Sequence, residues 1–173
     1  RNNLYVSDFN NARVLKFSAP VTAGSAAAVV FGQPGFTTRG VPAQASASTL
    51  AGPAGLCVDS SGNLYVSVPR DNRVLVFSSS TVVSGSAARD QLGQVDFTST
   101  QANPSSFPYA SASTFSAVSD IKPDADGNLI AADSGNNRVL LFPKGGKSAT
   151  KVWGQLDFKA NGANRIKPGS LNS

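Results

Sequence analysis

The chain has 173 residues, of which 15 are basic and 10 are acidic, so its formal net charge is +5. It contains one cysteine and no histidine, methionine or glutamate. A disulfide framework within the chain is therefore excluded, and the commonest catalytic base and zinc ligand is missing. Only 14% of the residues are charged, and Ser, Ala, Asn and Gly are abundant. This composition favours an exported β protein, extracellular or bound to the cell surface, and no apolar run is long enough to span a membrane.

The first predicted unit occupies residues 1–31. Two short apolar runs within Asn3–Phe17 (NLYVSDFNNARVLKF) flank a polar turn, and a further apolar run covers Ala27–Phe31. Short β-branched and aromatic runs separated by turn residues indicate antiparallel strands. Residues 32–54 form a long connection, which begins with GQPGF and contains a Ser/Thr-rich segment.

The same pattern returns twice. Residues 55–93 hold a complete second unit containing GNLYVSVPRDNRVLVF, and residues 117–153 hold a third unit containing GNLIAADSGNNRVLLF. Residues 94–116 and 154–173 are the second and third connections. In the second and third units an additional apolar run precedes an Asp-x-x-Gly-Asn turn, which predicts an innermost strand that the first unit lacks.

A second marker confirms the period. Gln33, Gln94 and Gln155 lie 61 residues apart, and each is the second residue of a GQ-x-x-F segment that ends at Phe36, Phe97 or Phe158. Four antiparallel strands repeated in tandem predict an all-β fold made of β-propeller blades, about three in this chain. The smallest ring takes roughly 240 residues at this period. We therefore expect an internal segment of a longer repeat protein, because a ring closed by two copies would still lack two inner strands.

The pattern GNLYVSD-x-x-N-x-RVL-x-F, preceded by the Asp-x-x-Gly-Asn turn, resembles NHL repeats. The resemblance covers all three units and implies a β-propeller, often six-bladed, whose members serve many roles. The GQ-x-x-F connections are similar to those of long, exported bacterial NHL-repeat proteins, which implies a bacterial source. Two positions depart from it: Val68 replaces the aspartate found at Asp8 and Asp133, and Ala12 separates the Asn-Arg pair of the first unit.

Charged residues at the hairpin turns favour structural ion pairs over ligand binding. Asp8 with Arg13, and Asp133 with Arg138, lie on opposite sides of a turn. Arg73 has lost the equivalent aspartate and needs another partner, for which Asp71 is the candidate.

Two other groups invite a chemical interpretation. The turn Asp124–Asn128 resembles the start of a calcium loop, but the late bidentate carboxylate of such a loop is missing, so a plain hairpin turn is favoured. Cys57 lies in a predicted inner strand without a histidine base, which indicates a buried apolar side chain. The Gln and Phe markers form either a repeated ligand platform or, as we favour, anchors that hold each connection to its blade.

These observations predict a non-catalytic binding or assembly scaffold without a cofactor. Its long connections and hairpin turns share one face, and loops on a rigid scaffold carry recognition. The partner is a protein, a glycan or further blades of the same parent. The candidate contact residues are Asn10, Asn11, Arg70, Asp71, Asn72, Asn136 and Asn137.

Two alternatives remain at this point. Basic residues gather late, at Lys144, Lys147, Lys151, Lys159, Arg165 and Lys167, which is compatible with nucleic-acid or polyanion binding, although few aromatic residues lie among them. The other alternative is a metal-dependent enzyme similar to lactonase-like or lyase-like propellers. No position matches the metal-binding histidines of such enzymes, so that activity does not transfer from the resemblance.

Overall fold

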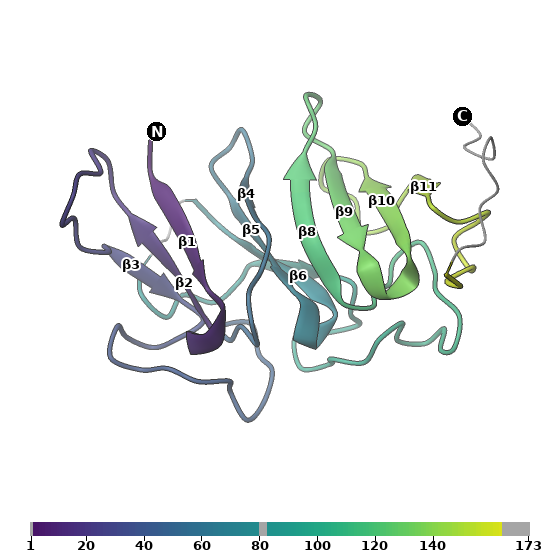
Figure 1. Cartoon of the computed structure of the whole chain (residues 1–173), viewed down its shortest axis with the longest axis horizontal. Helices are drawn as coiled ribbons and strands as arrows, with labels where there is room; N and C mark the ends of the chain where they lie inside the picture. The colour runs from purple at the N-terminus through teal and green to yellow at the C-terminus, as the bar shows by residue number, and fades with distance from the viewer. Residues whose placement is uncertain (1, 80–82, 164–173) are drawn as a thin grey trace.

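The computed structural model describes residues 2–79 and 83–163. Its elements are eleven strands in three antiparallel sheets, which lie side by side in chain order (Figure 1). Each sheet corresponds to one repeat unit and is called a blade here. The predicted all-β architecture of about three propeller-type blades is therefore confirmed.

Blade 1 has three strands in the order β1-β2-β3: β1 (Leu4–Asp8), β2 (Arg13–Phe17) and β3 (Val29–Phe31). Blade 2 has four strands in the order β4-β5-β6-β7: β4 (Leu56–Val58), β5 (Leu64–Val68), β6 (Arg73–Phe77) and β7 (Asp90–Leu92). Blade 3 repeats this order with β8 (Val118–Pro123), β9 (Leu129–Asp133), β10 (Arg138–Phe142) and β11 (Lys151–Trp153). The register of β8 against β9 shifts between Val118 and Asp120.

The hairpin between the two middle strands of each blade is a single turn of 3₁₀ helix. These turns are η1 (Phe9–Asn11), η2 (Pro69–Asp71) and η3 (Ser134–Asn136). Each ends at a residue with left-handed backbone, namely Ala12, Asn72 or Asn137. Asparagine tolerates this conformation better than most residues, which explains its presence at two of the three positions.

The core lies between the blades, because each blade is apolar on both of its faces. Between blades 1 and 2, Val14 and Phe31 pack against Val66, Leu75 and other side chains of blade 2. Between blades 2 and 3, the apolar residues are Cys57, Val74, Val76, Leu92, Phe115, Val118, Ile121, Leu129, Ala131, Leu140, Phe142 and Ala149. Cys57 thus lies in the core, as its position in a predicted inner strand indicated, and burial raises the pKa of its thiol to about 12.

Candidate binding face

The three 3₁₀ turns lie at one end of the blades, together with the long connections 32–55 and 93–117 (Figure 1, lower side). Residues 154–163 join the same surface, since the carbonyl of Asn161 accepts a hydrogen bond from Nδ2 of Asn137 at 3.0 Å, just beyond η3. We call this surface the turn face. Some side chains of the turn face anchor the connections, and those that remain exposed are free to contact a partner.

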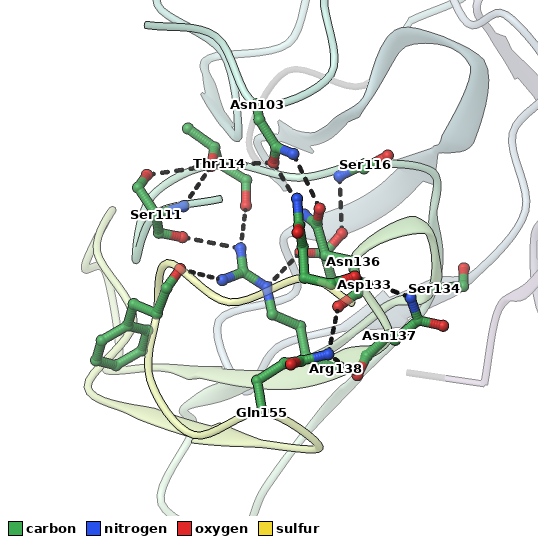
Figure 2. A network of polar contacts seen from close by, with 12 residues as sticks. Asn103, Ser111, Thr114, Ser116, Asp133, Ser134, Asn136, Asn137, Arg138 and Gln155 are labelled. Atoms are coloured by element: carbon green, nitrogen blue, oxygen red, sulfur yellow. Dashed lines mark hydrogen bonds and ion pairs between the residues drawn. The ribbon is translucent and has the colours of Figure 1, made fainter. Parts of the chain in front are cut away.

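One arginine per blade ties the connections to the turn, and the arrangement is most complete at Arg138 (Figure 2). Its Nε donates to Asp133 at 2.7 Å, and both side chains are fully buried. Its Nη1 donates to the carbonyl of Phe158 in the outgoing connection at 2.7 Å. Its Nη2 donates to the carbonyls of Ser111 and Thr114 in the incoming connection at 2.8 and 2.9 Å. The guanidinium therefore joins the connections before and after blade 3.

Arg73 makes the same bridge in blade 2. It donates to the carbonyls of Phe97 and Thr49, and its carboxylate partner is Asp71, at 2.9 Å. In blade 2 the carboxylate therefore lies inside the 3₁₀ turn. In blades 1 and 3 it lies at the end of the strand, at the position that Val68 occupies in blade 2. The fully buried Nε of Arg73 has no hydrogen-bond partner among the described residues, which is a cost of this displaced geometry.

Arg13 makes only half of the bridge. Its Nε donates to Asp8 at 2.8 Å and its Nη1 donates to the carbonyl of Phe36 at 2.7 Å. Within the part of the chain that the structure describes, its Nη2 has no partner, and the side chain is 18% exposed whereas Arg73 and Arg138 are 0% exposed.

The pKa values of the paired carboxylates follow their burial. Burial raises the pKa of Asp133, although hydrogen bonds from Asn136, the Ser116 amide and Arg138 oppose the change. Burial likewise raises the pKa of Asp71. The more exposed Asp8 responds chiefly to its hydrogen bond with Arg13, which lowers its pKa.

A pair of buried asparagines completes the network in blade 3 (Figure 2). Asn103 and Asn136 exchange two side-chain hydrogen bonds of 2.9 Å each. Nδ2 of Asn136 also donates to Asp133, and the Thr114 hydroxyl donates to Asn103. The long second connection is thereby locked onto η3. The sequence analysis missed Asn103 and Thr114, because no local pattern indicates a contact between residues 33 positions apart.

The glutamine markers hold the backbone of each turn. Nε2 of Gln155 donates to the carbonyls of Asn136, Asn137 and Gly162 at 2.8 to 3.2 Å. Gln33 and Gln94 donate to the equivalent carbonyls of their own turns and connections. The glycine before each glutamine is also required: Gly93 has a φ of +97°, and an added Cβ would meet the carbonyl oxygen of Asn72 at 2.8 Å.

The phenylalanine markers contribute through their carbonyls, which accept hydrogen bonds from the three arginines. The rings do not share one environment. Those of Phe97 and Phe158 pack against the core clusters, while Phe36 is 45% exposed. The three rings therefore do not form a uniform repeated platform.

The structure corrects the predicted contact residues at two positions. Asp71 and Asn136 are buried, because their side chains bind Arg73 and Asp133 inside the turns.

The remaining predicted contact residues differ in what their side chains already bind. Nδ2 of Asn72 donates to the Thr100 carbonyl and its Oδ1 accepts from the Ala117 amide, and Nδ2 of Asn11 donates to Asp8. Asn10, Arg70 and Asn137 are exposed. The Arg70 guanidinium stacks on the Phe9 ring of blade 1, 4.9 Å from its centroid.

Two aromatic residues of the turn face were not anticipated. Phe107 and Tyr109 are 78% and 65% exposed. Their segment is anchored to the third connection, since the Ala110 amide donates to the Lys159 carbonyl and Nδ2 of Asn161 donates to the Pro108 carbonyl. Exposed aromatic side chains on an anchored segment are typical of a contact surface.

A small cavity of about 50 Å³ lies between blades 2 and 3, at the end opposite the turn face. Its wall includes Cys57 and Tyr65 together with charged side chains, namely Asp59, Arg89, Asp90, Lys144 and Lys147. Lys147 forms an ion pair with Asp90. The late basic residues are thus divided, because Lys144 and Lys147 border this cavity while Lys159 lies in the third connection. Arg165 and Lys167 lie outside the described residues.

In the Asp-x-x-Gly-Asn turns at this end, the aspartate carboxylate accepts hydrogen bonds from within its own turn. The Asp124 carboxylate accepts hydrogen bonds from the amides of Asp126 and Asn128 and from the side chain of Asn128, and Asp59 repeats this pattern in blade 2. Among the described residues, no group of three or more Cys or Asp side chains is placed to hold a metal ion. No helix within those residues has the length and apolar character to cross a membrane.

Comparisons with known proteins support the fold. No protein-family model matches the chain, and no curated protein matches it in sequence. A solved streptogramin B lyase is similar in structure, with a TM-score of 0.53 and 11% identity over 89% of this chain. A virginiamycin B lyase from Staphylococcus aureus is also similar, with a TM-score of 0.50 and 11% identity over 90% of this chain. Both are β-propellers, and this chain spans only 37% and 38% of their lengths.

These similarities correct the prediction that the chain is not an enzyme. That prediction assigned a non-catalytic role to the propeller segment, whereas two solved structures that share its fold are lyases. At 11% identity the likeness shows the fold alone, so it assigns no reaction to this chain.

Proposed function

We propose that the chain is a segment of an exported NHL-type propeller that binds a protein or a glycan through its turn face. The observation that carries the proposal is the exposed pair Phe107 and Tyr109 on a connection held in place by buried hydrogen bonds. Preorganised loops lose little conformational entropy on binding, and aromatic residues dominate binding energy at many interfaces. Arg70, held against Phe9, adds a cationic group to the same face.

The test compares two variants of the labelled chain on arrays of defined glycans and of purified secreted proteins. Phe107→Ser/Tyr109→Ser removes both rings from the turn face. Val83→Ser is the matched control, because Val83 is 68% exposed but lies in the loop between β6 and β7. Loss of about 2 kcal/mol per central aromatic side chain corresponds to roughly thirtyfold weaker binding. Equal binding by both variants, or no binding by the wild-type chain, would contradict the proposal.

A catalytic role is the second candidate, favoured by the charged cavity between blades 2 and 3 and by the lyase activity named for the structural neighbours. The cavity wall offers Tyr65 together with the charged side chains Asp59, Asp90, Lys144 and Lys147, whereas the raised pKa of the Cys57 thiol makes it a poor nucleophile. The test incubates the chain with a streptogramin B antibiotic and follows conversion of the substrate by liquid chromatography coupled to tandem mass spectrometry, which also separates products of unchanged mass. Turnover that is lost in Asp90→Asn supports this role, and an unchanged substrate rejects it.

A further inference from the structure

Two cationic side chains border the cavity between blades 2 and 3 at positions where the repeat does not require a cation. The first is Arg89, which enters strand β7. Its amide donates to a carbonyl of the adjacent strand β6 at 2.8 Å, and the amides of Ala28 and Thr150 make the same contact in blades 1 and 3. Because the backbone contact is the same with three different side chains, the fold does not explain the arginine.

The second is Lys144, which follows strand β10. Its amide donates to Oδ1 of the asparagine that begins the repeat, at 3.2 Å, and the amides of Ala19 and Ser79 make the same contact at 3.2 and 3.3 Å. The side chain is again free to vary. At the interface between blades 1 and 2 the corresponding pair is Ala28 and Ser79, so only the interface between blades 2 and 3 brings two cations to one cavity.

The floor of this cavity is apolar. It consists of five members of the core cluster between blades 2 and 3, namely Cys57, Val76, Leu92, Leu129 and Phe142. Side chains that line a void lose dispersion contacts on that side, so an apolar group that enters the cavity restores them. The volume of about 50 Å³ suits only a few carbon atoms, about the size of an isopropyl group.

The other charged groups of the wall already have partners. Nζ of Lys147 pairs with the Asp90 carboxylate at 2.5 Å across the two blades. The Asp59 carboxylate accepts three hydrogen bonds of 2.7 to 2.9 Å within its own turn. Arg89 and Lys144 are exposed and form no ion pair with any residue that the structure describes. An apolar floor therefore lies beside two unpaired cations, one from each blade.

The lysine is held in place by its turn. The Gly146 amide donates to the Pro143 carbonyl at 2.7 Å, which closes a tight turn around Lys144. The lysine stem lies over Gly127, where an added Cβ would be 3.4 Å from Cδ of Lys144. A cation that is positioned before binding loses little conformational entropy when an anion arrives.

We propose that this cavity binds a small organic acid. The carboxylate of the ligand lies between Arg89 and Lys144 and accepts charge-assisted hydrogen bonds from both. Its short apolar group enters the floor formed by the core cluster. The site lies at the end opposite the turn face and requires no turnover, so it is independent of binding at that face and of catalysis.

The test titrates the isotopically labelled chain with isovalerate (3-methylbutanoate) and follows its amide signals by nuclear magnetic resonance. We expect saturable shifts at the residues of the cavity wall, with a dissociation constant on the order of 1 mM. Isovaleramide has the same shape without the charge, and acetate has the charge without the branched apolar group. Each is expected to bind at least about tenfold more weakly.

Two variants locate the carboxylate. Arg89→Ala and Lys144→Ser introduce the residues that blades 1 and 2 carry at the equivalent positions, so both are expected to fold. Each is expected to weaken isovalerate binding about tenfold. Lys151→Ala is the matched control, because Val152 packs toward blade 2 and the alternation along β11 turns Lys151 away from the cavity. Its affinity is expected to equal that of the wild-type chain.

The dispersion of the amide signals shows whether each variant is folded, and Arg89→Gln or Lys144→Gln replaces a variant that is not. Three outcomes would each overturn the proposal. They are the absence of saturable shifts at the cavity wall with isovalerate, equal binding of the acid and its amide, and an affinity that neither Arg89→Ala nor Lys144→Ser changes. None of them bears on the turn face, whose binding is measured with other partners and other variants.

Discussion

At the residue scale, the buried guanidinium of Arg138 and the partly exposed guanidinium of Arg13 are the same group in two environments. Both bind an aspartate through Nε and a phenylalanine carbonyl through Nη1. Only Arg138 is fully desolvated together with its partner. The two positions therefore separate the contribution of burial from that of the ion pair itself.

We expect Arg138→Met to lower the free energy of unfolding by about 3–5 kcal/mol, because it leaves Asp133 buried without its counter-charge. The matched change Arg13→Met removes a solvent-screened pair and is expected to cost less than about 1 kcal/mol. Urea denaturation of both variants in dilute solution measures the difference. Similar losses at the two positions would show that burial does not control the strength of this interaction.

Asp96 sets an acid-dependent contribution to stability. Hydrogen bonds from the side chain of Thr98, from Ser99 and from their backbone amides lower its pKa to about 2, against about 3.9 in an unfolded chain. Because the folded-state pKa is depressed, the contribution is present above the unfolded pKa and is lost as the pH falls toward 2.

We therefore expect wild type to exceed Asp96→Asn in stability at pH 7, and the gap to shrink as the pH falls from about 4 to about 2. The difference between the two proteins isolates Asp96 from the buried Asp71 and Asp133, whose pKa values shift the other way. Urea midpoints measured across this range provide the test. A gap that is independent of pH would rule out the carboxylate as its source.

At the element scale, the 3₁₀ turns of blades 2 and 3 both pair a buried arginine with an aspartate, but the aspartate occupies a different position in each blade. Asp133 lies at the end of β9 and binds Arg138 and the Ser116 amide. In blade 2, Asp71 lies inside the turn and binds Arg73 and the Ala51 amide. Val68 occupies the position that corresponds to Asp133.

Because the two turns are equivalent, we predict that an aspartate at position 68 can replace Asp71 as the partner of Arg73. Asp71→Asn alone is expected to cost about 3–5 kcal/mol, since Arg73 loses its buried partner. Adding Val68→Asp recreates the arrangement of blade 3 and is expected to recover part of the loss, with a coupling of about 1–3 kcal/mol between the two sites. A double-mutant cycle from denaturation curves measures the coupling. Additive effects would mean that the two turns are not interchangeable.

The sequence predicted the strands well because each blade repeats the same alternation of apolar and polar residues, and three copies reinforce one another. In blade 1, the predicted apolar run Ala27–Phe31 contains the observed strand β3 (Val29–Phe31). The pairing of Arg73 with Asp71 also followed from the loss of the aspartate at Val68. The turns were harder: a 3₁₀ turn buries Asp71 and Asn136, and short polar sequences do not reveal which of their side chains point inward.

The binding surface was the least predictable part. Asn103 reaches Asn136 across the connection, and nothing local in the sequence marks that contact. Phe107 and Tyr109 resemble ordinary apolar residues until their exposure is known. Comparing the repeats helps only in part, because the segment between Phe97 and Ser111 is longer than the equivalent segment between Phe36 and Ser46, which contains no aromatic residue.

At the scale of the whole molecule, the three blades differ in how many neighbours support them. Blade 2 is packed on both faces, while blades 1 and 3 each have one face open within the described residues. In repeat architectures, stability is close to a sum of the stabilities of single units and of the interfaces between neighbours. Local opening therefore requires least free energy where a unit has lost an interface.

We accordingly expect amide hydrogen exchange to be slowest in β5 and β6 and faster in β1 and β2, although both pairs form five-residue hairpins with the same register. Blade 1 has one apolar interface and lacks a fourth strand, and its Arg13 binds only one of the two connections that Arg73 joins. Exchange followed by mass spectrometry, with the chain dilute so that copies do not meet, measures the order. Leu50→Ala provides the control, because it weakens the core between blades 1 and 2 and should speed exchange in β1 and β2 more than in β9 and β10. Equal protection in β1 and β5 would show that the chain opens as one cooperative body, with no separate contribution from each interface.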